Sequence, residues 1–178
     1  MASLAAEVFS GWAECPRPQG LPQRIGHGDP KAANILFDPT GPDAWSLIDL
    51  DTVAWTSLEL ELGDAMRSWT RVDCEDEGPA FSVARFESAM VGYVGEGRDS
   101  ITAEEVNAVV AGLERIGWEL TARFACDALE ECYFGWDPSV ATTRGAHNLL
   151  RAREQLRVVA QVVAQRPTLE RMVAQIWG

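Results

Sequence analysis

The sequence predicts a mainly α-helical fold with one small β-hairpin. Apolar residues recur at helical spacing over most of the chain, and the longest such run covers residues 106–124. Two short apolar runs, residues 35–37 and 45–48, flank a connection rich in Asp, Pro and Gly, a pattern typical of a hairpin. With 178 residues, of which 47% are hydrophobic and 24% charged, the chain fits one globular domain that can bury a core.

The first half of the chain contains three further predicted elements. Residues 2–13 have apolar positions at helical spacing and lead into a Pro- and Gly-rich stretch, so we expect a helix followed by a loop. The same spacing predicts a helix over residues 58–69. The acidic, Pro-containing residues 73–79 predict a loop.

The second half is expected to be a helical bundle. Residues 83–90 predict a helix that the glycines at 92, 95 and 97 end. Thr102 and Glu105 form a capping-box signature before the 106–124 run, which we expect to be the spine of the bundle. Two last helices are predicted over residues 149–163, ending near Pro167, and 169–176.

Charge and composition exclude several classes of protein. The net charge is −12 and Lys31 is the only lysine, which argues against nucleic-acid binding because that requires clustered basic residues. No apolar stretch reaches the ~20 residues of a membrane span, and the start has no basic leader region, so we expect a cytoplasmic protein without a membrane partner. The acidity serves solubility, or favours cationic substrates. The four cysteines are too far apart for paired metal-binding knuckles and are interpreted as reduced structural thiols.

The stretch from His27 to Asp51 carries the chemistry. It reads H-G-D-P-K-A-A-N, followed by the predicted hairpin and then I-D-L-D. His27, Asp29 and Asn34 complete an H-x-D-x-x-x-x-N pattern, and Asp49 follows the second apolar run, in the order of a protein kinase catalytic loop and its metal-binding aspartate. D-L-D stands in place of D-F-G. The stretch therefore resembles the small-molecule branch of that superfamily: aminoglycoside phosphotransferases, choline kinases and N-acetylhexosamine kinase-like enzymes.

The resemblance continues over about residues 20–165 and is greatest to the N-acetylhexosamine kinase-like group. Residues 48–53 and 62–67 are similar to that group's I-D-x-D-T-V and G-D-x-x-R motifs. The resemblance implies that residues 1–178 form a single unit, the C-terminal catalytic lobe of a protein-kinase-like fold, without the N-terminal lobe that covers ATP.

The resemblance also implies a reaction: ATP- and Mg²⁺-dependent transfer of a phosphoryl group to a hydroxyl of a small molecule. Asp29 would be the base, and Lys31 would neutralise charge on the γ-phosphate. Asn34 and Asp49 offer the hard oxygen ligands that Mg²⁺ prefers. The acceptor implied is first a sugar or amino sugar, and second an aminoglycoside or a choline-like molecule.

Other residues are expected to support the site or bind the acceptor. His27 is interpreted as a packed imidazole that braces the loop, and Asp64 as an acceptor for backbone N–H groups of that loop. Asp51 has three interpretations: outer metal ligand, acceptor for a sugar hydroxyl, or helix cap. By resemblance, Arg123 and Tyr133 contact the acceptor.

Two hypotheses for function remain open. Only 26 residues precede His27, no G-x-G-x-x-G occurs, and no lysine lies upstream of Lys31. The chain is therefore expected to be a piece of a two-lobed kinase, the product of a shortened gene, or a lobe that works with another chain. The alternative is a non-catalytic remnant that binds a small molecule or a protein. In each case, Phe37, Trp45, Leu47 and Trp55 are expected on an exposed surface through which the chain self-associates.

Overall fold

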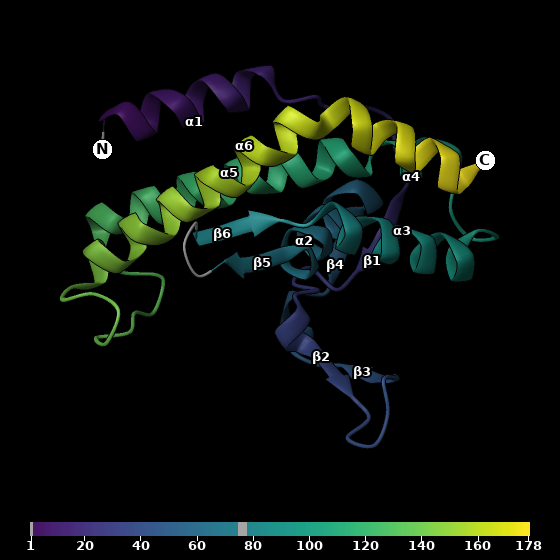
Figure 1. The fold of residues 1–178 in the computed structure, drawn as a ribbon, viewed down its shortest axis with the longest axis horizontal. Coiled ribbons are helices and arrows are strands. Elements are labelled where there is room, and N and C mark those ends of the chain that lie inside the picture. The colour runs from purple at the N-terminus through teal and green to yellow at the C-terminus, as the bar shows by residue number, and fades with distance from the viewer. Residues whose placement is uncertain (1, 75–77) are drawn as a thin grey trace.

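The computed structural model describes residues 2–74 and 78–178 and is mainly helical, as predicted (Figure 1). Two long helices, α5 (Val109–Glu130) and α6 (Arg144–Trp177), lie side by side at its centre. Helix α1 (Ala2–Glu14) packs along α5, and α2 (Leu58–Trp69) crosses it. Helix α3 (Val83–Gly97) and the short α4 (Ala103–Asn107) contact α2 and α6. In the part of the chain that is described, no helix is long and apolar enough to cross a lipid bilayer.

The described residues form three two-stranded antiparallel sheets instead of one hairpin. The predicted hairpin is β2 (Ile35–Phe37) with β3 (Ala44–Leu47), and it projects from the helical body (Figure 1). Strand β1 (Gln23–Gly26) pairs with β4 (Ala54–Ser57), a pairing between segments too short and too distant to predict from local pattern.

The prediction of a loop over residues 73–79 is wrong for those residues of the stretch that the structure describes. Strand β5 (Arg71–Cys74) pairs with β6 (Gly78–Phe81), while residues 75–77 lie outside the described part. Buried Phe81 contacts the ring of Phe86, and its N–H donates to the side chain of Gln161 on α6. These tertiary contacts outweigh the weak strand preference of an acidic, Pro-containing stretch.

Two predicted helix ends also differ. Helix α3 runs through Gly92 and Gly95 and ends at Gly97. Helix α6 is one element that contains Pro167, although Pro removes a backbone donor, and Figure 1 shows that the helix changes direction in its C-terminal part. Leu169 and Val173, both almost fully buried beyond the proline, continue the apolar face, so packing against the core maintains the helix.

The helix predicted over residues 106–124, the expected spine of the bundle, is interrupted near its start. Ala108 separates α4 from α5, and the predicted capping box of Thr102 and Glu105 starts α4. Glu105 also binds Arg24 of β1, which ties that sheet to the bundle.

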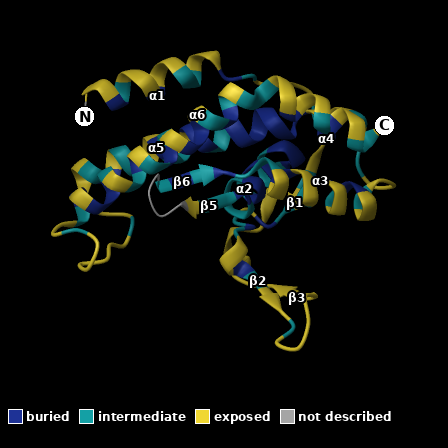
Figure 2. Cartoon of the chain, in the orientation of Figure 1, coloured by how far each residue is buried: buried dark blue, intermediate teal, exposed yellow. Residues whose placement is uncertain are grey.

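The main core lies between α2, α3, α5 and α6 (Figure 2). Helices α2 and α5 approach closely at Gly63 and Gly112, because a Cβ at Gly112 would lie 1.8 Å from the carbonyl oxygen of Glu59. The fully buried carboxylate of Glu114 on α5 forms a two-bond ion pair with Arg166 on α6. Close backbone contact and this ion pair therefore fix α5 between its two neighbours.

Candidate active site

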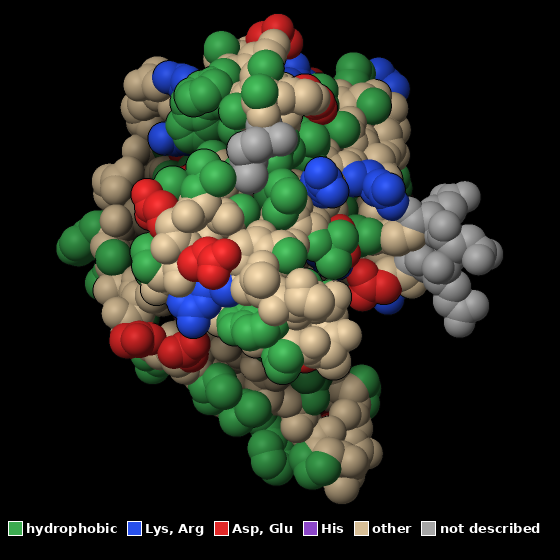
Figure 3. Space-filling view, turned by 90° about the vertical axis from the view of Figure 1, so that its left-hand side faces the viewer, with side chains coloured by type: hydrophobic (Ala, Val, Ile, Leu, Met, Phe, Trp, Pro, Cys, Tyr) green, Lys and Arg blue, Asp and Glu red, His purple; other side chains and the backbone are tan. Residues whose placement is uncertain are grey.

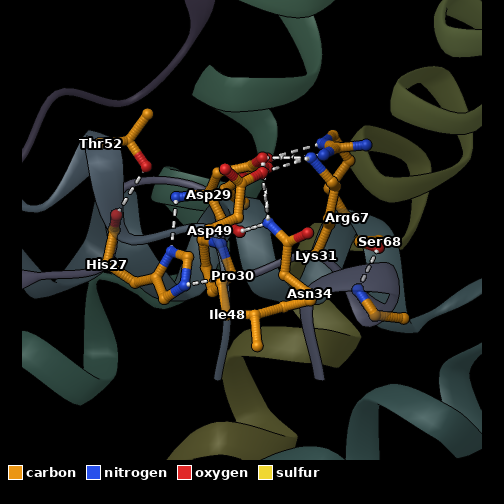
Figure 4. A network of polar contacts seen from close by, with 12 residues as sticks. His27, Asp29, Pro30, Lys31, Asn34, Ile48, Asp49, Thr52, Arg67 and Ser68 are labelled. Atoms are coloured by element: carbon orange, nitrogen blue, oxygen red, sulfur yellow. Dashed lines mark hydrogen bonds and ion pairs between the residues drawn. The ribbon is translucent and has the colours of Figure 1, made fainter. Parts of the chain in front are cut away.

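The imidazole of His27 stabilises the H-G-D loop through hydrogen bonds at both ring nitrogens (Figure 4). The imidazole is 7% exposed, and its Nε2 lies 2.9 Å from the carbonyl oxygen of Ile48. Its Nδ1 accepts the backbone N–H of Asp29 at 3.3 Å, so Nε2 carries the proton and donates to Ile48. His27 thereby connects the start of the loop to the residue before Asp49.

Gly28 is required by the conformation of this loop. Its φ is +81°, in the left-handed region, and a Cβ there would lie 2.4 Å from the carbonyl oxygen of Thr52. The hydroxyl of Thr52 donates to the carbonyl oxygen of His27 at 2.8 Å. The segment after Asp49 is thus held directly against the loop.

Helix α2 holds the same loop from the opposite side. The Glu61 carboxylate accepts the N–H groups of His27 at 2.8 Å and Gly28 at 3.0 Å. Near the C-terminal end of the same helix, the Ser68 hydroxyl accepts the N–H of Ala32 at 3.0 Å, and Trp69 Nε1 donates to the carbonyl oxygen of Pro30 at 2.8 Å. Four hydrogen bonds from one helix fix the loop at both ends.

The role that the sequence analysis assigned to Asp64 belongs to Glu61 in this structure. Asp64 instead binds the guanidinium of Arg67, three residues on, at 2.7 Å. Glu61 lies one turn earlier on the same helix, and its longer side chain reaches the loop. The signal that we missed was a second acidic residue at i−3 from the motif aspartate.

Four motif side chains meet in one polar cluster, in which Figure 4 shows them pointing toward one another. Asn34, only 5% exposed, donates from Nδ2 to Oδ2 of Asp29 at 3.2 Å and lies 3.5 Å from Oδ2 of Asp49. The Lys31 ammonium binds the Asp29 carboxylate and lies 3.8 Å from that of Asp49. The hydrogen bond to Asp29 raises the pKa of Lys31, so this ammonium stays charged. The hairpin between residues 34 and 49 brings the two motifs together.

Asp49 has a backbone conformation that is uncommon for residues other than glycine. Its φ is 69° and its ψ 58°, the left-handed region, and its side chain is 49% exposed. The 3₁₀ turn η2 (Leu50–Thr52) follows directly. Asp51, in that turn, is exposed and makes no hydrogen bond or ion pair with other described residues, so the structure does not bring it into the cluster.

A groove of about 610 Å³ extends from the cluster to helix α5. Asp29, Lys31, Arg123 and Tyr133 all line it. The Arg123 guanidinium lies 5.3 Å from the ring centre of Tyr133 and 5.5 Å from that of Phe134. The structure therefore places both residues that the resemblance assigned to the acceptor in the same groove as Asp29.

Asp127 organises the far wall of this groove, and the sequence analysis missed it. The buried carboxylate accepts three consecutive backbone N–H groups, those of Cys132, Tyr133 and Phe134, at 2.7–3.0 Å, and the amide of Asn148 at 2.7 Å. Burial opposes ionisation, but these N–H groups outweigh it and hold the pKa of Asp127 below its usual value. The available signal was an acidic residue on the apolar face of a long helix.

A second, apolar groove of about 600 Å³ separates the β2–β3 hairpin from the body. Trp45 and Leu47 line it. Phe37, Trp45, Leu47 and Trp55 are 46–70% exposed, as the sequence analysis expected. Figure 2 shows the hairpin as almost wholly exposed, and Figure 3 shows hydrophobic side chains on the projecting lower part of the molecule. We call this area the hairpin surface.

The chain matches the model of a known protein family. The sequence model described as the phosphotransferase enzyme family matches residues 2–96. This range includes the H-G-D loop, the hairpin, Asp49 and helix α2, and it ends before Arg123 and Tyr133.

Proposed function

The chain belongs to the phosphotransferase enzyme family, and we propose that its polar cluster transfers the γ-phosphoryl group of ATP to a hydroxyl of a small molecule, with Mg²⁺. The observation that carries this proposal is the meeting of Asp29, Asn34 and Asp49 around the Lys31 ammonium, at the edge of a groove. Such an arrangement can accept a proton and neutralise phosphate charge at one point.

We assign the base to Asp29, because its carboxylate faces the groove and its position is fixed by His27 and Asn34. Lys31 lies beside it with its charge maintained, as a group that stabilises the phosphoryl oxygens must. For Asp29 to receive a proton from the acceptor, Lys31 must move from this carboxylate to the phosphate.

Asn34 and Asp49 would hold the metal ion. Each side chain offers a hard oxygen atom, and the two side chains are neighbours, with Nδ2 of Asn34 3.5 Å from Oδ2 of Asp49. The half-exposed Asp49 leaves room for ligands from outside the protein. Among the described residues there is no cluster of three or more His, Cys, Asp or Glu placed to bind a metal, so phosphate oxygens and water would complete the coordination. Bound there, Mg²⁺ supplies positive charge to the phosphates.

The acceptor is proposed to be a sugar or amino sugar, with aminoglycosides and choline-like molecules as second choices. The resemblance of residues 48–53 and 62–67 to the N-acetylhexosamine kinase-like group supports this order. So does the groove, which combines hydrogen-bonding groups with the Tyr133 ring across from Asp29. We place the reaction in the cytoplasm, where ATP is supplied.

We propose that these 178 residues act as the C-terminal lobe of a two-lobed kinase. No G-x-G-x-x-G loop and no lysine other than Lys31 is present to cover the phosphates. The chain alone should bind nucleotide weakly and transfer phosphate slowly at best. Its hairpin surface should drive self-association, which light scattering at high protein concentration will detect; a monomer there contradicts this part of the proposal.

The reaction is tested with a two-lobed form, made by extending the reading frame upstream or by adding a separate ATP-covering lobe. Release of ADP is measured with a panel of sugars, amino sugars and choline. Asp29→Ala should abolish turnover while leaving the fold intact, since Asp29 is partly exposed. Asp99→Ala, at an exposed aspartate in the turn after α3, is the matched control. Undiminished turnover in Asp29→Ala rules out the assigned role.

The second candidate is a non-catalytic remnant that binds a small molecule or protein. The ion pair that occupies Asp29 favours this candidate. Two results together would establish it: no in-frame glycine-rich strand pattern upstream, and no increase in Tm with Mg²⁺ and ATP.

A further inference from the structure

Two exposed thiols lie at the C-terminal end of helix α5. Among the free cysteines that the structure describes, Cys15 is buried, as a structural thiol should be, whereas Cys126 and Cys132 are exposed. Cys126 lies near the end of α5, and Cys132 follows the end of the helix. Because neither of these two is buried, packing in the core gives no reason for either thiol.

The chain turns back toward Cys126 where α5 ends. Glu131 has a left-handed φ of 53°, and its N–H donates to the carbonyl oxygen of Asp127 at 2.9 Å. At such a helix end, the residue after the left-handed position commonly contacts a side chain about four or five residues before that position. Here the residue after it is Cys132, whose own N–H donates to the Asp127 carboxylate at 3.0 Å. Asp127 directly follows Cys126, so the turn brings the two cysteines together.

The carboxylate of Glu130 is shared by both thiols. The Cys132 thiol lies 3.8 Å from Oε2 of Glu130. The charge of Glu130, together with a hydrogen bond to it, raises the pKa of Cys126, and charge on Cys132 acts in the same direction. Partial desolvation and the charges of Asp127 and Glu130 raise the pKa of Cys132. Two thiols that share one acceptor and act on each other are neighbours, and both are protonated at neutral pH.

We propose that Cys126 and Cys132 form a modification site, at which hydrogen peroxide oxidises the two thiols to a reversible disulfide. One sulfur attacks the peroxide, the O–O bond breaks, and a sulfenic acid and hydroxide result. The other sulfur attacks the sulfenic sulfur, so that the S–S bond forms, the S–O bond breaks and a second hydroxide leaves. The two thiol protons convert both hydroxides to water, and the two electrons lost by sulfur reduce the peroxide. In reducing compartments, disulfides of this kind are usually transient and redox-sensing.

The disulfide would act on the groove beside Asp29, because Cys132 directly precedes Tyr133 and Phe134. Both aromatic residues line that groove, and the carboxylate of Asp127 accepts their N–H groups. A bond from Cys132 to α5 closes a short loop of chain and reduces the conformational freedom of this segment. Oxidation is therefore expected to fix the part of the groove wall that carries Tyr133.

The first experiment treats the reduced chain with hydrogen peroxide and locates disulfides by peptide mass mapping. We expect a Cys126–Cys132 link within one chain, which dithiothreitol reverses and which is lost in Cys126→Ser and in Cys132→Ser. Cys15→Ala, which removes a buried thiol, should keep the link. Phenylarsine oxide binds tightly to two neighbouring thiols and needs no oxidant. The unaltered chain should bind it, and neither serine variant should.

A second experiment removes the shared carboxylate. Glu130→Gln should form the disulfide roughly two- to threefold faster at low salt, because the thiolate fraction rises by up to about fivefold while the lower pKa weakens the nucleophile. The difference should shrink as NaCl is added. Glu87→Gln, which makes the same charge change at an exposed position on α3, should react at the rate of the unaltered chain.

Three results would overturn the disulfide: separate oxidation of the two thiols to sulfinic acids, disulfides only between chains, or no binding of the arsenical. An unchanged rate in Glu130→Gln at low salt overturns the contact of both thiols with Glu130. On oxidation, amide exchange at Tyr133 and Phe134 should slow by up to about 50-fold, the limit set by loop closure. Unchanged exchange there overturns the effect on the groove. None of these measurements requires phosphoryl transfer, so this inference and the proposed function fail separately.

Discussion

Replacing Glu61 by Ala should release the H-G-D loop from helix α2. The change removes the acceptor for two N–H groups, that of His27, which is partly buried, and that of Gly28, which is exposed. A hydrogen bond to a charged group contributes about 1.5–3 kcal/mol when buried, and the exposed one contributes less, so we expect a loss of about 2–4 kcal/mol in local stability.

Amide hydrogen exchange followed residue by residue is the appropriate assay, because the effect is local. A loss of about 2 kcal/mol corresponds to roughly 30-fold faster exchange at His27 and Gly28. Amides of the α5 core, such as that of Leu113, should exchange at an unchanged rate.

Asp64→Asn is the matched control for this prediction. Within the described part of the chain, its carboxylate pairs with Arg67 on the same helix, an interaction of about 0.2–0.5 kcal/mol, so the loop amides should remain protected. The assignment to Glu61 would be refuted if exchange at His27 became faster in Asp64→Asn and stayed unchanged in Glu61→Ala. Asp64 would then be the acceptor for the loop N–H groups, as the sequence analysis expected.

Three further predictions concern the bundle. Gly112→Ala places a Cβ 1.8 Å from a backbone oxygen and should lower stability by about 1–3 kcal/mol in urea denaturation, whereas Gly92→Ala, with open space around it, should raise it by about 0.5–1 kcal/mol. Arg166→Ala leaves the carboxylate of Glu114 buried and unpaired and should cost about 3–5 kcal/mol; Tm within 2 °C of the unaltered chain would contradict this. Because the pKa of Asp127 is lowered by folding, its stabilising effect is complete above the usual aspartate value of about 3.9 and is lost as the pH falls through the folded value. Asp127→Asn should therefore lose less stability than the unaltered chain on acidification, as measured by thermal unfolding between neutral and acidic pH.

The polar cluster could be predicted from the sequence because its parts are local. Asp29 and Asn34 lie five residues apart on one loop, and Asp49 follows a hairpin whose register, Ile35 opposite Leu47, returns the chain to its start. Contacts that depend on tertiary packing could not be read from the sequence. Glu61 reaches the loop only because α2 crosses α5 at two glycines, and Asp127 matters only because the chain turns back over it after residue 131.

The same distinction applies to the fold. Helical periodicity located α1 and α2 within about one residue. The helix end predicted near Pro167 and the loop predicted over residues 73–79 were wrong, because packing outweighs the local sequence preference at both places. The strands β1 and β4 each have four residues, and their partners lie about 30 residues apart, so no local pattern indicates the pairing.

The left-handed backbone of Asp49 limits how this position can vary. Most side chains are disfavoured there by about 1–2 kcal/mol, while Gly, Asn and Asp tolerate the conformation. Of these three residues, only Asp carries a negative charge, so a single position meets a backbone requirement and a charge requirement together. Under neutral drift, a gene that no longer needs catalysis would retain the fold with Asn or Gly at position 49. An Asp at position 49 therefore indicates that the negative charge is needed, whereas an Asn or Gly would satisfy the backbone conformation alone.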